Sequence, residues 1–134
     1  MKNSTRTFER IPCELRVRYE FVKWNVNNCT QVKSENVAHC IDISVAGVGL
    51  STPIPLTRRL AAQLLKGVKK IRLSLILPDC DQPEVFFARL VWSANSDILP
   101  KNRCGFKFID ISEKQFKRLQ ECINKSLFIQ KTMQ

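Results

Sequence analysis

Five runs of this sequence place apolar residues at every second position, and this alternation constrains the fold more than any other feature. In the first run, apolar side chains from Cys13 to Phe21 alternate with Glu14, Arg16, Arg18 and Glu20. Because successive side chains of a strand point to opposite faces, the pattern predicts half-buried strands. The alternating segments are 13–21, about 37–45, 71–77, 86–92 and 103–108. The chain is therefore predicted to be mainly β.

Two segments have helical patterns instead. The run 57–67 is rich in Ala and Leu, with Thr57 as a predicted N-cap and Gly67 as the C-terminal stop. Near the chain's end, Ser112 and Gln115 form a capping-box pattern before an apolar stripe at helical spacing, Phe116, Leu119, Ile123 and Leu127. Five or six strands, mostly antiparallel because their connections are short, thus precede a C-terminal amphipathic helix. This order is typical of a barrel or a sandwich.

The 134 residues suit one domain. We predict a flexible N-terminal arm over 1–12, where polar residues show no clear periodicity, and a folded domain over 13–134. No apolar run approaches the roughly 20 residues of a membrane span, and no secretory signal is visible, so a cytoplasmic location is expected. The six cysteines are scattered without a C-x-x-C pair, which favours reduced, buried thiols over disulfides or a metal site.

The sequence offers no support for catalysis. The single histidine, His39, adjoins Cys40 in a predicted strand, so the two side chains should point to opposite faces and cannot form a nucleophile–base pair. The phosphate-loop, dinucleotide-binding and zinc-protease motifs are missing. We therefore expect a protein that is not an enzyme and needs no metal or cofactor. The net charge of +10 predicts attraction to an anionic partner.

Polar residues interrupt the apolar stretch 40-CIDISVAGVGL-50 in an unusual way. Asp42 and Ser44 should share one face of the predicted strand, and Gly47 falls where the backbone must bend or be approached closely. Upstream, 6-RTFER-10 places Arg6 and Arg10 on the predicted arm. Two readings stay open: a basic tail beside an ordinary turn, or two halves of one ligand site.

The paired patterns R-x-x-x-R and D-x-S-x-x-G resemble the signature of the PilZ domain, a bacterial receptor module for cyclic di-GMP. The stretches 88-ARLVW-92 and 104-CGFKFIDIS-112 resemble the family's closing strands. The resemblance implies a six-stranded antiparallel PilZ-type β-barrel with a C-terminal α-helix, to which the short helix near 57–67 is added. It also implies cyclic di-GMP as the ligand.

The resemblance implies a role for each motif residue. Arginine grips phosphate bidentately and donates to guanine, which suits Arg6 and Arg10. The Asp42 carboxylate suits the N–H donors of a guanine edge, Ser44 would hydrogen-bond nearby, and Gly47 would permit close approach. Secondary candidates for ligand contact are Thr7, Val45, Ala46 and Trp92.

Trp92 also has a structural interpretation. It shares the predicted face of Phe86 and Leu90, which favours a place in the core over a stacking platform.

These features predict a cyclic di-GMP receptor that changes the conformation of its arm on binding and signals to an unidentified downstream protein. One alternative is a degenerate PilZ-fold interaction subunit, for instance in pilus or flagellar machinery, that does not bind the nucleotide. Another is a basic barrel that binds nucleic acid. Asp42 argues against the latter, because a carboxylate in a phosphate-binding groove is unfavourable unless it reads a base.

Overall fold

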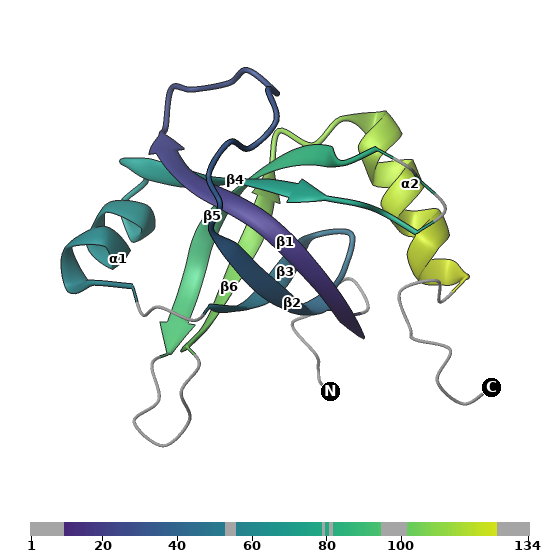
Figure 1. The fold of residues 1–134 in the computed structure, drawn as a ribbon, viewed down its shortest axis with the longest axis horizontal. Helices are drawn as coiled ribbons and strands as arrows, with labels where there is room; N and C mark the ends of the chain where they lie inside the picture. The colour runs from purple at the N-terminus through teal and green to yellow at the C-terminus, as the bar shows by residue number, and fades with distance from the viewer. Residues whose placement is uncertain (1–9, 53–55, 79, 81, 95–101, 126–134) are drawn as a thin grey trace, which may run out of the picture.

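The protein folds into a closed barrel of six antiparallel strands flanked by two helices (Figure 1). This computed structural model describes residues 10–52, 56–78, 80, 82–94 and 102–125. The neighbour order around the barrel is β1-β2-β3-β6-β5-β4, and β4 pairs with β1 to close it. The elements are β1 (Ile11–Lys23), β2 (Val37–Ile43), β3 (Gly47–Thr52), α1 (Arg58–Leu65), β4 (Lys69–Leu75), β5 (Glu84–Ala94), β6 (Asn102–Ile109) and α2 (Glu113–Asn124). The predicted fold class is confirmed.

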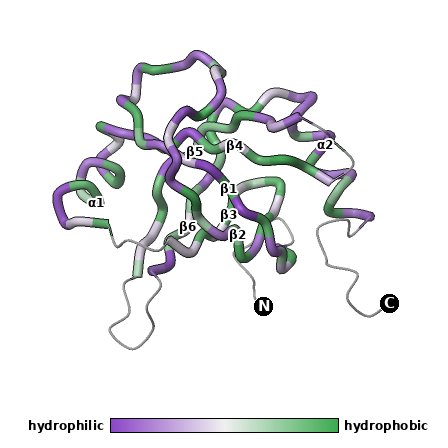
Figure 2. Tube along the Cα trace, in the orientation of Figure 1, coloured by the Kyte–Doolittle hydropathy of each residue, from purple (hydrophilic) through white to green (hydrophobic). Residues whose placement is uncertain are grey.

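The alternating side chains divide between the barrel interior and its outer face. Along β1, Cys13, Val17 and Tyr19 are buried, whereas Glu14 and Arg16 are exposed. Figure 2 shows the same alternation of hydrophobic and hydrophilic residues along this strand. The interior is filled by apolar residues from all six strands, including Val17, Ala38, Cys40, Leu50, Leu73, Phe86, Leu90 and Phe106. Burial of these faces provides the main stabilisation of the barrel.

The predicted strand at about 37–45 is shorter than expected and is followed by one that was not predicted. β2 ends at Ile43, and residues 44–46 turn the chain into β3. Ser44 therefore does not continue the strand on the face of Asp42, and that part of the prediction was wrong. Every residue of β3 is buried, so this strand lacks the polar alternation that marks the others.

Both helices begin directly after their predicted N-cap residues. The Thr57 hydroxyl accepts a hydrogen bond from the Leu60 N–H at 3.1 Å, and Gly67 follows α1 with a φ of 78°. Ser112 and Gln115 make both hydrogen bonds of the capping box. α1 packs against β4 and β5. On α2, Leu119 and Ile123 are buried and Phe116 is partly buried, whereas Leu127 lies outside the described residues.

The N-terminal boundary is partly visible. β1 begins at Ile11, two residues before the predicted start at Cys13. Residue 10 of the predicted arm over 1–12 is also described, whereas residues 1–9 lie outside the described residues, so the flexibility of the arm and the positions of Arg6 and Thr7 stay predictions.

Candidate functional site

Arg10 and Asp42 meet at the start of the barrel. In the antiparallel register of β1 and β2, Pro12 lies opposite Asp42, which brings the residue preceding β1 next to the carboxylate. The Nη2 group of Arg10 donates a hydrogen bond to Asp42 Oδ1, with 3.1 Å between the nitrogen and the oxygen. The side chains are 22% and 35% exposed, respectively, so the pair is accessible from solvent. The structure thus joins a residue of the R-x-x-x-R pattern to one of the D-x-S-x-x-G pattern.

Ser44 shapes the turn between β2 and β3. Its hydroxyl oxygen accepts from the N–H groups of Ala46 at 3.0 Å and Gly47 at 3.2 Å, while its own N–H donates to the Gly47 carbonyl at 2.9 Å. The side chain is nearly fully buried. In this state the hydroxyl holds the turn that follows Asp42, as side-chain to backbone bonds commonly do.

Two glycines in this region allow different close approaches. A Cβ on Gly47 would lie 2.1 Å from the carbonyl oxygen of Phe106, so Gly47 lets β3 and β6 come together. A Cβ on Gly49 would lie 2.6 Å from Asp42 Oδ1, so Gly49 makes room for the carboxylate. Gly49 was not among the predicted site residues, because the strand that carries it, β3, was not predicted.

A row of paired residues continues from Asp42 across the outer face. Asp42 is opposite Gly49, Gly49 is opposite Gly105, and Gly105 is opposite Trp92. A Cβ on Gly105 would lie 2.2 Å from Trp92 Nε1, so the indole covers this glycine. The Asp42 carboxylate and the Trp92 indole therefore lie over neighbouring glycines.

The prediction that Trp92 belongs to the core was wrong. Its side chain is 41% exposed, whereas Phe86 and Leu90 are buried. The strand register between β5 and β6 shifts between Leu90 and Trp92. Such an irregularity changes the face to which the following side chains point. Trp92 is thereby available for contact with a ligand.

The other secondary candidates line the turn. Val45 is buried and Ala46 is partly buried, and the Ala46 carbonyl accepts a hydrogen bond from Phe108 N–H at 2.8 Å. Their contribution is to tie the turn after Asp42 to β6.

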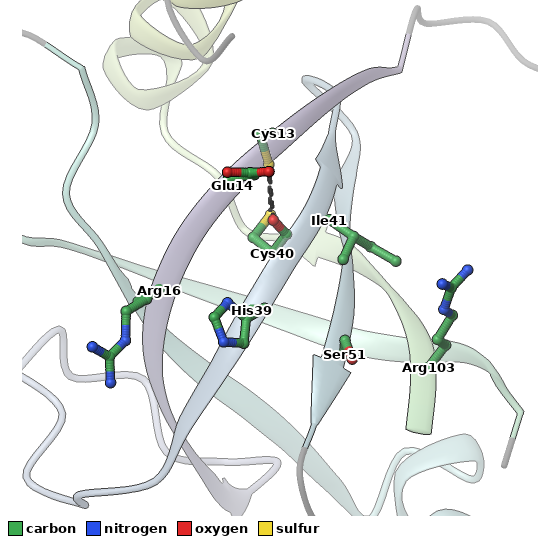
Figure 3. Close-up of a pocket in the computed structure, with 8 residues that line it drawn as sticks. All are labelled: Cys13, Glu14, Arg16, His39, Cys40, Ile41, Ser51 and Arg103. Carbon is green, nitrogen blue, oxygen red and sulfur yellow. Dashed lines mark hydrogen bonds between the residues drawn. The ribbon is translucent and has the colours of Figure 1, made fainter. Parts of the chain in front are cut away.

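Two thiols lie beneath this part of the barrel (Figure 3). The sulfurs of Cys13 and Cys40 are 3.3 Å apart, and Cys40 donates to the backbone carbonyl of Asp42 at 3.2 Å. The hydrogen bond with Cys13 and burial raise the pKa of Cys40 well above its ordinary value. Cys40 is therefore a neutral thiol that anchors the backbone of Asp42. Among the described residues, no group of three or more His, Cys, Asp or Glu side chains could hold a metal ion.

Comparison with known proteins agrees with this geometry. The family model described as PilZ domain matches residues 4–125. The chain belongs to the PilZ domain family. None of the curated proteins matches it.

Solved PilZ proteins share the fold at low sequence identity. The PilZ domain of YcgR from Escherichia coli with c-di-GMP is 15% identical, with 91% of each chain covered and a TM-score of 0.56. The inhibitor of motility MotI/DgrA from Bacillus subtilis is 18% identical, with a TM-score of 0.65 over 93% of this chain and 52% of that one. This chain thus spans about half the length of MotI/DgrA. No helix among the described residues is long and apolar enough to cross a membrane.

Proposed function

We propose that this PilZ domain is a receptor for cyclic di-GMP that catalyses nothing and passes the signal to a partner protein. The observation that carries the proposal is the contact between Arg10 and Asp42, which unites the two motifs in one solvent-accessible place. A PilZ domain of similar fold has been solved with c-di-GMP. The proposal assigns ligand binding to Arg6, Arg10, Asp42, Ser44 and Gly47.

The chemistry of the pair suits a guanine nucleotide. A guanidinium has five N–H donors, and a single one of those of Arg10 bonds to a described side chain, that of Asp42. The remaining donors can bind a phosphate or the O6 and N7 acceptors of guanine. Gly49 leaves room for the Asp42 carboxylate, and Arg10 donates a hydrogen bond to one of its oxygens. Its second oxygen is available to accept from the guanine N–H groups.

The arm supplies the second arginine in this proposal. Arg6 is four residues before Arg10, so it can close over a ligand that Arg10 and Asp42 already hold. Ordering of the arm would change the surface that a partner reads. Trypsin offers a direct assay, because cleavage after Arg6 should slow when the ligand is bound.

Calorimetric titration with cyclic di-GMP tests the site. We expect saturable binding by the wild type and a loss of about ten- to hundredfold in Arg10→Ala and Asp42→Ala, since charged hydrogen bonds contribute about 1.5–3 kcal/mol. Arg18→Ala is the matched control, because Arg18 is an exposed arginine of β1 that forms no ion pair with a described residue.

Further results of such titrations separate the alternatives. Unchanged binding in both site variants would contradict the assigned residues. No binding by the wild type would contradict the proposal as a whole and favour a PilZ subunit that acts through protein contacts alone. Titration with a single-stranded polynucleotide tests whether the net charge of +10 leads to nucleic-acid binding. Affinity that grows with strand length and falls steeply with salt, without preference for the cyclic dinucleotide, would indicate a nucleic-acid-binding barrel.

A further inference from the structure

A hollow lies on the outer face of the barrel, across β1, β2, β3 and β6 (Figure 3). Its volume is about 540 Å³, and its polar lining includes Glu14, Arg16, His39, Ser51 and Arg103. A volume in this range is typical of small-molecule sites and much larger than a bare phosphate ion requires.

The strand register places four of these residues in one row. Arg16 lies opposite His39, His39 opposite Ser51, and Ser51 opposite Arg103. Figure 3 shows the arginines at the two ends of this row with His39 and Ser51 between them. The row is parallel to the one that contains Asp42 and Gly49, displaced from it by about 7 Å along the strands.

Ser51 provides an independent sign of a ligand. Its side chain is only 4% exposed, and its Oγ is the one buried side-chain nitrogen or oxygen without a hydrogen-bond partner among the described residues. Leaving such a group unpaired costs about 1–3 kcal/mol, so native structures rarely do so without a reason. Ser51 is one of the residues that line the hollow, and an oxygen of a bound molecule would satisfy its hydroxyl.

The charged side chains that line the hollow indicate the kind of molecule that fits it. Arg16 and Arg103 are exposed and form no ion pair with any other described residue. Guanidinium groups match phosphate oxygens bidentately, and His39 and Ser51 add donors between them. Glu14, a single carboxylate at the same hollow, would repel a bare anion but accept from a hydroxyl or amino group.

We propose that this hollow is a second binding site, which holds a small phosphate ester with its phosphate over His39 and Ser51 between the two arginines. The hydroxyl or amino groups of its organic part face Glu14. None of the polar side chains proposed to hold the phosphate ester bonds to Arg10 or Asp42, so variants can test this site and the cyclic di-GMP site proposed above separately.

His39 makes the test unusually direct, since it is the only histidine of the chain. Its imidazole C–H signals in proton NMR therefore report on the hollow without assignment. Inorganic phosphate and 5′-GMP are the probes, titrated at fixed pH with the ionic strength balanced by sodium chloride. We expect a saturable shift with both, and tighter binding of GMP because it fills more of the volume.

Matched variants test which side chains bind the two probes. Arg16→Gln and Arg103→Gln should each weaken binding about tenfold or more, and Ser51→Ala should weaken it as well, whereas Arg18→Gln should leave it unchanged. Dispersed methyl signals in the same spectra verify that each variant is folded.

Three results would overturn the proposal: no saturable shift up to tens of millimolar of either probe, an equal loss in Arg18→Gln, or loss of phosphate binding in Arg10→Gln. The last variant also separates the two sites, because it should abolish cyclic di-GMP binding while the His39 response to phosphate persists.

Discussion

Substituting Gly49 by alanine should disable the proposed ligand site without replacing any residue that is proposed to contact the ligand. The added Cβ would lie 2.6 Å from Asp42 Oδ1 and 3.2 Å from its Cγ. Gly49 does not have a positive φ, so the backbone accepts alanine. The carboxylate is the end of a side chain and therefore moves instead of the strand. Binding sites tolerate displacements of only about 0.5 Å. The carboxylate has to move farther than that to relieve this contact.

The effects on stability and on binding should differ in size. Displacing Asp42 breaks its partly exposed ion pair with Arg10, which costs about 0.2–1 kcal/mol. Replacing glycine by alanine restricts the unfolded chain and returns about 0.4–1 kcal/mol. The free energy of unfolding should thus change by less than about 1 kcal/mol. The affinity for cyclic di-GMP should fall at least about tenfold, because charge-assisted hydrogen bonds to the ligand are lost.

Urea unfolding and calorimetric titration measure the two quantities on the same samples. Gly67→Ala is the control: its φ of 78° makes alanine strained, with no atom within 4 Å of the added Cβ. It should lower stability by about 1–2 kcal/mol and leave binding unchanged. Wild-type affinity in a folded Gly49→Ala variant would refute the role of Asp42. A loss of more than about 3 kcal/mol of stability would show that the strand moves instead of the carboxylate.

Three further predictions concern the scaffold. Burial raises the pKa of Cys104 from 9.0 to about 12, so its contribution to stability is complete below pH 9 and declines as the pH rises towards 12. Cys104→Ala should therefore reduce the alkaline loss of stability in urea unfolding, and an unchanged pH profile would contradict this. Lys70 is buried over the Phe87 ring, and burial lowers its pKa. Lys70→Met keeps the apolar stem without the charge, so unfolding at neutral pH should be unaffected or require more urea; a lower free energy of unfolding would refute this. Ser112→Ala removes the capping box of α2 and should lower the free energy of unfolding by about 1 kcal/mol, and thermal melting with no shift would contradict that role.

The sequence predicted those parts of the fold that depend on local pattern. Alternation located β1, β4 and β6, since their outer faces carry polar side chains. Capping residues located both helices, because Thr57 and Ser112 bond to their own first turns. β3 was missed because both of its faces are buried, so no polar residue alternates within it.

The parts of the site that depend on strand register could not be predicted in this way. The motifs identified Arg10 and Asp42, but their contact follows from the pairing of β1 with β2. Trp92 was assigned to the wrong face, because an irregularity in pairing leaves no mark in the spacing of residues along β5. The hollow combines residues from four strands, and no local motif indicates which of them lie side by side.

Closure of the barrel restricts how a partner protein could bind it. β4 pairs with β1, so each strand of the described barrel has neighbours on both sides. Free sheet edges are where proteins commonly recruit an extended peptide or aggregate. Without such an edge in this barrel, a partner has to recognise side chains or a helix, and its specificity then depends on the surface pattern rather than on main-chain hydrogen bonds. The same closure protects the barrel against edge-to-edge association.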